Sequence, residues 1–345
     1  MREATTPITV KSAFDSLKAA GYPRPYVEKL LPDWWDNSLF KTSAGAFQFA
    51  MILKQRLGLN VQFGQDGALE IQMSAPQARY KRRSDTHEEE LNIAASLGIA
   101  LARLAIFCTS IPYEPPQADP LAIRALVLSE SKKTFVDFEG LLDLCWFCGI
   151  PVLFLKGMPK NTKRMTGMTV NVDGRPAIIL GFNTAQHSRQ LFVLAHELAH
   201  ILCGHLEDNG VLIDEDISGV TDTLLGSQVV RKDGEEREAD AFALALLRNG
   251  HPNPVREMGR PDSAATLASS AMSVGRAHAI DPGHLILSYA KEHDDWARAN
   301  QALNFMPNPI SAIELVEQKF RANTVLESLS EENQEHVLFI QGFGG

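Results

Sequence analysis

The sequence predicts an α+β fold that is mostly helical, with a small mixed β-sheet packed against one buried helix. Apolar residues at helical spacing recur along much of the 345-residue chain, and runs of strand-forming residues gather between 151 and 182. The stretch from Leu191 to His205 is apolar nearly all round, as expected for a helix inside a core. We therefore divide the chain into an N-terminal helical region with a small hairpin (1–85), a central domain built on that helix (86–252) and a C-terminal helical region (253–345).

The N-terminal region is predicted to contain helices and one hairpin. Three helices are expected at 11–21, 24–35 and 43–58. The segment 61–72 has the pattern of two short strands that turn at Gln65-Asp66-Gly67.

The densest basic cluster of the chain follows this hairpin, at Arg79, Lys81, Arg82 and Arg83. Tyr80 lies within it, and basic side chains beside an aromatic ring suit contact with the phosphates of nucleic acid. A solvated linker face is the commoner meaning of such a run, and we favour it over nucleic-acid contact.

The central domain is predicted to combine three helices with a small sheet. Helices are expected at about 87–107, 119–130 and 136–148, and strands at 151–156, 165–172 and 175–182. Asp173-Gly174 between the last two strands favours a tight hairpin. This hairpin leads into the apolar helix, for which Asn183 and Thr184 offer capping oxygens.

The rest of the chain is predicted to be a loop followed by helices. Residues 206–233 are polar and irregular, and a helix begins near Glu235; further helices are expected at about 262–276, 282–293, 310–322 and 325–338. The segment 262–290 has the spacing of a helix-turn-helix. Because short helical pairs are far more often structural than DNA-reading, a sensor or DNA-binding role is the alternative interpretation.

Composition limits the class of protein. The net charge of −9 argues against a dedicated nucleic-acid binder. No run reaches the roughly 18 apolar residues that a membrane span needs, and the N-terminus lacks the apolar segment of a signal peptide. With four cysteines in a chain of this length, we expect reduced thiols, a cytoplasmic location and no membrane partner.

The apolar helix carries the motif HExxH as His196-Glu197-Leu198-Ala199-His200. Residues at i and i+4 lie on one face of a helix, so both imidazoles can bind one metal ion. This pattern is typical of zinc, with Glu197 beside the metal as the catalytic general base. The sequence therefore predicts a Zn²⁺ cofactor held by His196 and His200.

A catalytic zinc needs a third protein ligand, and an acidic helix begins at Glu235. Glu236 and Asp240 are spaced i and i+4 and share one face. We predict that Glu236 binds the metal and that Asp240 accepts the outer N–H of a ligand histidine. Glu238 and Glu235 are the alternative third ligands.

Together these motifs resemble the gluzincin-type zinc peptidases, and more narrowly the ImmA/IrrE family. The resemblance rests on RQLFVLAHELAHILCGH, EREADAFALALL and AHAIDPGHLILSYA, and it covers about residues 90–290. It implies a zincin-like HExxH helix, with zinc held by His196, His200 and Glu236. One departure is Ala279, where the family usually has Gly.

The resemblance also implies a function. Family members are bacterial proteases that cut a helix-turn-helix transcriptional repressor at a specific site, often after DNA damage. Length and the added N-terminal helices look closest to the CapP-type peptidases of anti-phage operons, for which single-stranded DNA is the activating signal. We therefore expect a repressor substrate and a single-stranded DNA activator.

Such a protease must be restrained until it is signalled, and a thiolate on the open zinc position would do this. Cys108 ends a predicted helix before a proline-rich loop, and we consider it as this inhibitory ligand. The competing class is a non-catalytic, metal-stabilised regulator that binds a repressor or DNA. An intact Glu197 argues against that class, because structural zinc sites fill all four positions with protein ligands.

Overall fold

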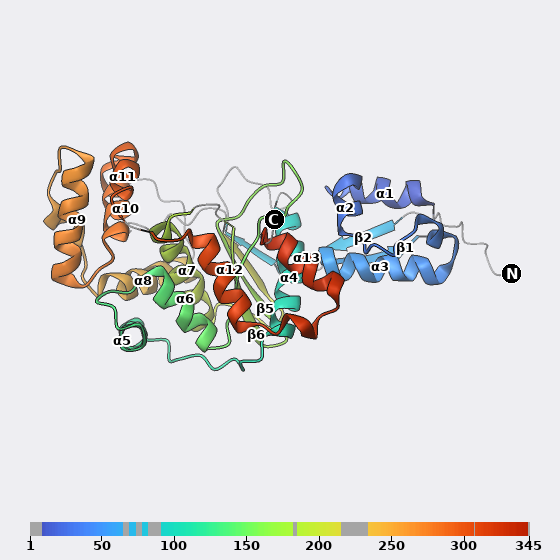
Figure 1. The fold of residues 1–345 in the computed structure, drawn as a ribbon, viewed down its shortest axis with the longest axis horizontal. Helices are drawn as coiled ribbons and strands as arrows, with labels where there is room; N and C mark the ends of the chain where they lie inside the picture. The colour runs from blue at the N-terminus through green and yellow to red at the C-terminus, as the bar shows by residue number, and fades with distance from the viewer. Residues whose placement is uncertain are drawn as a thin grey trace.

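The computed structural model describes residues 9–64, 69–73, 78–81, 91–181, 185–214, 234–306 and 308–343. Figure 1 shows an elongated molecule with the N-terminal region at one end, a group of three helices at the other and the sheet between them. Within the described residues, no helix is long and apolar enough to cross a membrane.

The N-terminal region has the three expected helices and the two paired strands of the expected hairpin, whose predicted turn at Gln65-Asp66-Gly67 lies outside the described residues. Its elements are α1 (Val10–Ala19), α2 (Arg24–Leu30), the 3-10 helix η1 (Asn37–Lys41), α3 (Ser43–Leu57), β1 (Leu59–Phe63) and β2 (Leu69–Met73). Strands β1 and β2 pair antiparallel. Helix α2 ends earlier than predicted, because Pro32 disfavours helical backbone in the residue before it.

The central sheet is mixed, as predicted, and has two strands that the sequence did not reveal. Its order is β3-β7-β5-β6-β4, and its strands are β3 (Ala78–Lys81), β4 (Val152–Phe154), β5 (Gly167–Val172), β6 (Arg175–Leu180) and β7 (Val211–Asp214). Strand β5 pairs antiparallel with both β6 and β7. At the two edges of the sheet, β3 pairs in parallel with β7, and β4 pairs in parallel with β6. Strand β7 lies in the segment 206–233, which was predicted as a loop. The strand was missed because its four residues are too few to show a strand pattern among polar neighbours.

The sheet separates two helices, α4 (Asn92–Cys108) and α7 (His187–Leu202). Successive side chains of a strand point to opposite faces. On β5, the Met168 side chain lies so close to Gly98 of α4 that a Cβ there would be 2.5 Å from it. The next residue, Thr169, hydrogen-bonds to Glu197 of α7. Helices α4 and α7 therefore cover opposite faces.

Further helices surround α7 and extend the molecule. They are α5 (Pro120–Ser131), α6 (Phe138–Phe147), α8 (Gly234–Arg248), η3 (Pro254–Met258), α9 (Ala264–His278), α10 (Pro282–His293), α11 (Trp296–Leu303), α12 (Ala312–Asn323), η4 (Leu326–Ser328) and α13 (Glu331–Gln341). Helices α9 to α11 share a hydrophobic core of their own, whereas α12 and α13 return to the main core. The region 253–345, which the sequence analysis treats as one unit, is thus divided between two cores (Figure 1).

Helices α9 and α10 form the helix-turn-helix-like pair of the sequence. Ala279 has left-handed backbone at the turn, with a φ of 58°. A Cβ on Gly283 would meet the Ser188 Oγ at 1.8 Å, so the start of α10 lies directly against the start of α7. All residues from Gly283 to Ala290 are buried. A recognition helix needs a face that can enter a DNA groove, and α10 does not present one.

Candidate metal centre

Helix α7 brings the two motif histidines together in the core. Both imidazoles are at most 1% exposed, and their Nε2 atoms lie 3.1 Å apart. The apolar turns on either side of the motif bury the helix and so exclude water from the pair. The helix begins at His187 after Gln186, which makes no side-chain cap, while the expected caps Asn183 and Thr184 lie outside the described residues.

Helix α8 packs along α7 and places Glu236 against both histidines. Its carboxylate oxygens lie 3.2 Å from Nε2 of His200 and 3.6 Å from Nε2 of His196. The alternative ligand Glu238 faces His205 instead, and Glu235 is not part of the metal-binding group found among the described residues. The structure thus brings together the three residues that the sequence analysis selected as ligands.

Asp214 completes the group, and sequence reasoning missed it. This last residue of β7 is 1% exposed, and its Oδ2 lies 3.5 Å from Nε2 of His196 and 3.8 Å from Nε2 of His200. Strand pairing places it opposite Gly167, and Thr166 N–H donates to its carbonyl at 2.7 Å. Only the pairing of β7 with β5 brings it near α7, so spacing along the chain gave no signal.

The donor set fits a zinc ion. Zinc–ligand bonds of roughly 2.0–2.1 Å in a tetrahedron place neighbouring ligand atoms about 3.3 Å apart. The ligand atoms of His196, His200, Asp214 and Glu236 lie within 4.8 Å of one another, and the distances from the two histidine Nε2 atoms to each other and to the carboxylate oxygens are 3.1 to 3.8 Å. Neither oxygen of Asp214 accepts a well-formed hydrogen bond among the described residues, and a cation would satisfy this buried carboxylate.

The outer nitrogens of both histidines have polar groups within about 3 Å, at 3.1 Å for His196 and 2.9 Å for His200. Asp240 lies on α8 with Oδ1 3.1 Å from Nδ1 of His196, which is the position predicted for it. When a histidine binds metal through Nε2, its hydrogen is on Nδ1, and a carboxylate there orients the ring. For His200, the Nδ1 partner is the Nδ1 of His205, 2.9 Å away, and Nε2 of His205 lies 3.1 Å from Glu238.

Cys203, His205 and Glu238 also have ligand atoms close together. A neutral histidine that binds a metal through Nε2 carries its hydrogen on Nδ1. If His200 and His205 both bound metals in this way, two hydrogens would face each other between Nδ1 atoms only 2.9 Å apart. With neutral imidazoles, the two groups cannot hold metals at the same time. His205 is therefore assigned to a hydrogen-bond chain from His200 to Glu238.

Glu197 is fully buried between α7 and the sheet. The Thr169 hydroxyl donates to its Oε2 at 2.5 Å. A Cβ on Gly167 would be 2.0 Å from Oε1, so only glycine leaves room for this carboxylate. Burial raises the pKa of Glu197 and the nearby Asp214 carboxylate adds to this, so the pKa lies well above its ordinary value despite His196 and Thr169. A carboxylate with a raised pKa is suited to take up and return a proton.

The charges of the group also affect its other members. Burial lowers the pKa of His196, but its close contacts with the Asp214 and Asp240 carboxylates outweigh burial and raise the pKa well above its ordinary value. Burial raises the pKa of Asp214, and the hydrogen bond to His196 and the charges of both histidines lower it below its ordinary value overall. Concentrated negative charge beside the two imidazoles favours a bound cation.

Cys108 does not reach this centre, which corrects the expectation of an inhibitory thiolate. Its Sγ donates to the carbonyls of Leu104 and Ala105 inside the core. Helix α4 lies on the other face of the sheet, and its end contacts Arg175, whereas the metal group lies near Gly167 at the opposite end of β5 and β6. Burial also raises the pKa of the thiol to about 11, which keeps it protonated.

The predicted nucleic-acid contacts are only partly described. The backbones of Arg79 and Lys81 lie in β3, paired with Leu212 and Asp214 of β7. Arg82 and Arg83 lie outside the described residues.

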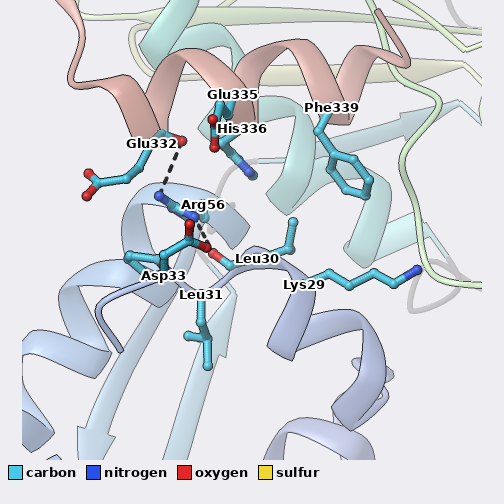
Figure 2. Close-up of a pocket in the computed structure, with 10 residues that line it drawn as sticks. Lys29, Leu30, Leu31, Asp33, Arg56, Glu332, Glu335, His336 and Phe339 are labelled. Carbon is cyan, nitrogen blue, oxygen red and sulfur yellow. Dashed lines mark hydrogen bonds between the residues drawn. The ribbon is translucent and has the colours of Figure 1, made fainter. Parts of the chain in front are cut away.

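A separate hollow of about 240 Å³ lies between the N-terminal region and α13. Figure 2 shows Arg56 reaching between them, with hydrogen bonds to the Leu30 carbonyl at 2.5 Å and the Glu332 carbonyl at 3.3 Å. His336 lines the same hollow and is 4% exposed. None of the metal-centre residues lines this hollow. Arg56 links the N-terminal region to α13 there through its two hydrogen bonds.

Comparison with known proteins supports the assignment of the centre. No curated protein matches the chain. Residues 148–249 match the family described as IrrE N-terminal-like domain, Peptidase_M78. The matched segment runs from the end of α6 through α8 and includes the HExxH helix, Asp214, Glu236 and Asp240. The segment between residues 148 and 249, which holds the metal group, is therefore similar to an IrrE N-terminal-like peptidase domain.

Proposed function

We propose that this chain is a zinc-dependent endopeptidase. The observation that carries the proposal is the placement of Glu197 beside His196, His200 and Glu236, in a domain of a peptidase family. A metal site without catalytic work would not need a buried carboxylate held in place by its own hydroxyl donor. We also place the protein in the cytoplasm, where its four free cysteines would stay reduced.

The residues divide the work between binding and proton transfer. His196, His200 and Glu236 would hold the zinc, which would supply a Lewis acid that polarises the scissile carbonyl and makes water more acidic. Asp240 and His205 keep the two imidazoles in the metal-binding tautomer. Thr169 holds Oε2 of Glu197, which leaves Oε1 to accept a proton from water and deliver it to the leaving amine.

We propose that the substrate is a helix-turn-helix transcriptional repressor and that its cleavage derepresses a stress, phage-defence or mobile-element operon. The support is the resemblance to ImmA/IrrE peptidases together with the matched domain. An extended substrate chain could add to the sheet at the outer edge of β3. Among the described strands, β5 and β6 are paired on both sides and β3 and β4 are terminal, and β3 is the terminal strand next to β7, which carries Asp214.

We further propose that single-stranded DNA activates cleavage. The support is the basic cluster that begins on β3, one strand away from Asp214. Phosphate contacts by basic residues would weaken as salt rises, which separates a real DNA signal from nonspecific stimulation.

The test is cleavage of the helix-turn-helix protein encoded beside this gene, with zinc present, with and without single-stranded DNA. Wild type and E197Q are compared. Cutting by wild type alone supports the peptidase, and dependence on DNA supports the activator. Cutting that is equal without DNA would remove the activator from the proposal. A zinc-loaded wild type that cuts nothing would overturn repressor cleavage.

Asp214 favours a second candidate, a non-catalytic metal-stabilised regulator that binds a repressor or DNA. Structural zinc sites have four protein ligands, and the described residues provide four donors. The two candidates differ in the effect of E197Q. It would leave a regulator fully active in repressor binding and derepression, but it would abolish the action of a peptidase.

A further inference from the structure

The metal group has one more protein donor than a catalytic zinc centre uses. Catalytic sites keep three protein ligands and one open position. Here His196, His200 and Glu236 would supply three, and Oδ2 of Asp214 lies 3.5 and 3.8 Å from the two Nε2 atoms. These separations are close to the roughly 3.3 Å edge of a zinc tetrahedron. Asp214 is thus placed where the fourth ligand of that tetrahedron belongs.

We propose that Asp214 is a fourth metal ligand in the resting protein and keeps the centre closed until this carboxylate moves aside. The inference rests on the proposed zinc site. It assigns to Asp214 the restraining role that the sequence analysis considered for Cys108.

The origin of the four donors explains why Asp214 is the one that leaves. His196 and His200 lie one turn apart on α7, and Glu236 lies on α8, which packs along it. The outer nitrogen of His200 is hydrogen-bonded to His205, and that of His196 lies 3.1 Å from Asp240. Asp214 comes from β7, where its backbone pairs with Gly167 of β5 and Lys81 of β3. Its carboxylate contacts the two imidazoles at 3.5 and 3.8 Å, and neither oxygen has a hydrogen bond of good geometry among the described residues.

Strand pairing also places Asp214 opposite Gly167, the residue against which Oε1 of Glu197, the proposed general base, lies. While Asp214 is bound to the metal, it occupies the place that a substrate carbonyl or water needs, next to the atom that must take the proton. Rotation of one side chain would open the position without moving the other three ligands. A single buried residue is therefore sufficient to separate a resting state from an active one.

The experiment measures metal binding and access to the metal, so it needs no peptide substrate. Full-length wild type, D214N, E236Q and D208N are stripped of metal. Zinc affinity is measured by competition with a chromophoric chelator. Each protein is then loaded with Co²⁺, and acetohydroxamate, which needs an open metal position, is titrated against the visible absorption. Asp208 is an exposed carboxylate six residues before Asp214, so D208N is a matched control.

We expect D214N still to bind one equivalent of zinc, because three protein ligands remain, which is the number a catalytic zinc site uses. We expect its cobalt form to bind acetohydroxamate at least about tenfold more tightly than wild type, because a closed state that dominates lowers apparent affinity by the open fraction. D208N should match wild type, and E236Q should lose tight metal binding.

Two results would overturn the inference. In the first, D214N binds acetohydroxamate no better than wild type does, so Asp214 does not close the centre. In the second, D214N loses metal as E236Q does, so Asp214 is a permanent ligand. A wild type that binds no zinc would instead overturn the proposed function, and this outcome is distinguishable because it appears before any variant is compared.

Discussion

The hydroxyl of Thr169 donates a hydrogen bond to Oε2 of Glu197 across 2.5 Å, and it does so from the sheet to the HExxH helix. Both residues are completely buried. The general base of the proposed peptidase is therefore positioned by a strand that lies far from it in the sequence, and not by its own helix alone.

Removing this hydroxyl should impair proton transfer without removing the metal. We expect T169V to lower kcat by about ten- to a hundredfold, because a general base contributes on the order of 10²–10⁴ in rate and loses its orientation here. Zinc affinity should stay unchanged. T109V is a matched control, since Thr109 is also buried and donates to a helix carbonyl, on α4. Equal kcat for T169V and wild type would show that Glu197 is held by other contacts.

Gly167 should tolerate no side chain. In G167A the new Cβ would be 2.0 Å from Oε1 of Glu197, so the carboxylate must move out of position. We expect loss of most peptidase activity and about 1–3 kcal/mol lower stability, as is typical of overpacking. G234A on α8 is the control, because a Cβ there meets no atom of the described residues within 4 Å. Activity in G167A close to that of G234A would contradict this geometry.

The acidic residues of α8 should differ sharply in their effect on the metal. E236Q removes a ligand, and we expect at least about a hundredfold loss of zinc affinity. D240N weakens the orientation of His196, and we expect a loss of about ten- to a hundredfold. E235Q should bind zinc as wild type does. Chelator competition on the purified proteins measures all three, and an E235Q protein weaker than E236Q would show that the third ligand has been assigned to the wrong residue.

Acid should destabilise the junction between the N-terminal region and α13 through His336. Burial and the charge of Arg56 lower the pKa of His336 from 6.5 to about 3. Between these two values the unfolded chain binds a proton that the folded protein excludes. Stability therefore falls as the pH drops below 6.5, with a slope of at most about 1.4 kcal/mol per pH unit from this residue.

The measurement is urea unfolding of wild type and H336Q at several pH values between 7.5 and 4.5. The glutamine does not titrate, so the stability of H336Q should fall less steeply with acid, and the two curves should differ most at the lowest pH. Parallel curves would mean that His336 is not excluded from protonation. The side chain lines the hollow of Figure 2, and the effect should therefore not depend on zinc.

The sequence was sufficient for the parts of the centre that depend on helical spacing. His196, Glu197 and His200 can be read from one turn of helix, and Glu236 with Asp240 from the next acidic helix start. The structure brings these residues together, and the hairpin at Asp173-Gly174 is also where the sequence predicts it.

The remaining features depend on contacts between distant elements. Asp214 lies on a strand too short to recognise among polar residues, and only its pairing with β5 places it at the metal. The need for Gly167 arises from a carboxylate that belongs to α7. Cys108 was misplaced because a position at a helix end does not reveal which face of the sheet that helix covers. The positions of Asp214, Gly167 and Cys108 all depend on the order of the strands in the sheet and on which face of the sheet each helix covers. The spacing of residues along the chain does not reveal either.

The most direct test of the central claim combines zinc content with peptide hydrolysis, without assuming the natural substrate. Wild type, E197Q, D214N and the D214N/E197Q double variant are purified, their zinc is quantified, and each is incubated with a mixture of proteome-derived peptides that is read by mass spectrometry. We expect one zinc per chain in all four. We also expect cleavage by wild type or D214N, which disappears in both proteins that carry E197Q. Cleavage that survives E197Q, or an absence of cleavage in zinc-loaded D214N and wild type alike, would contradict the assignment of this centre to a peptidase.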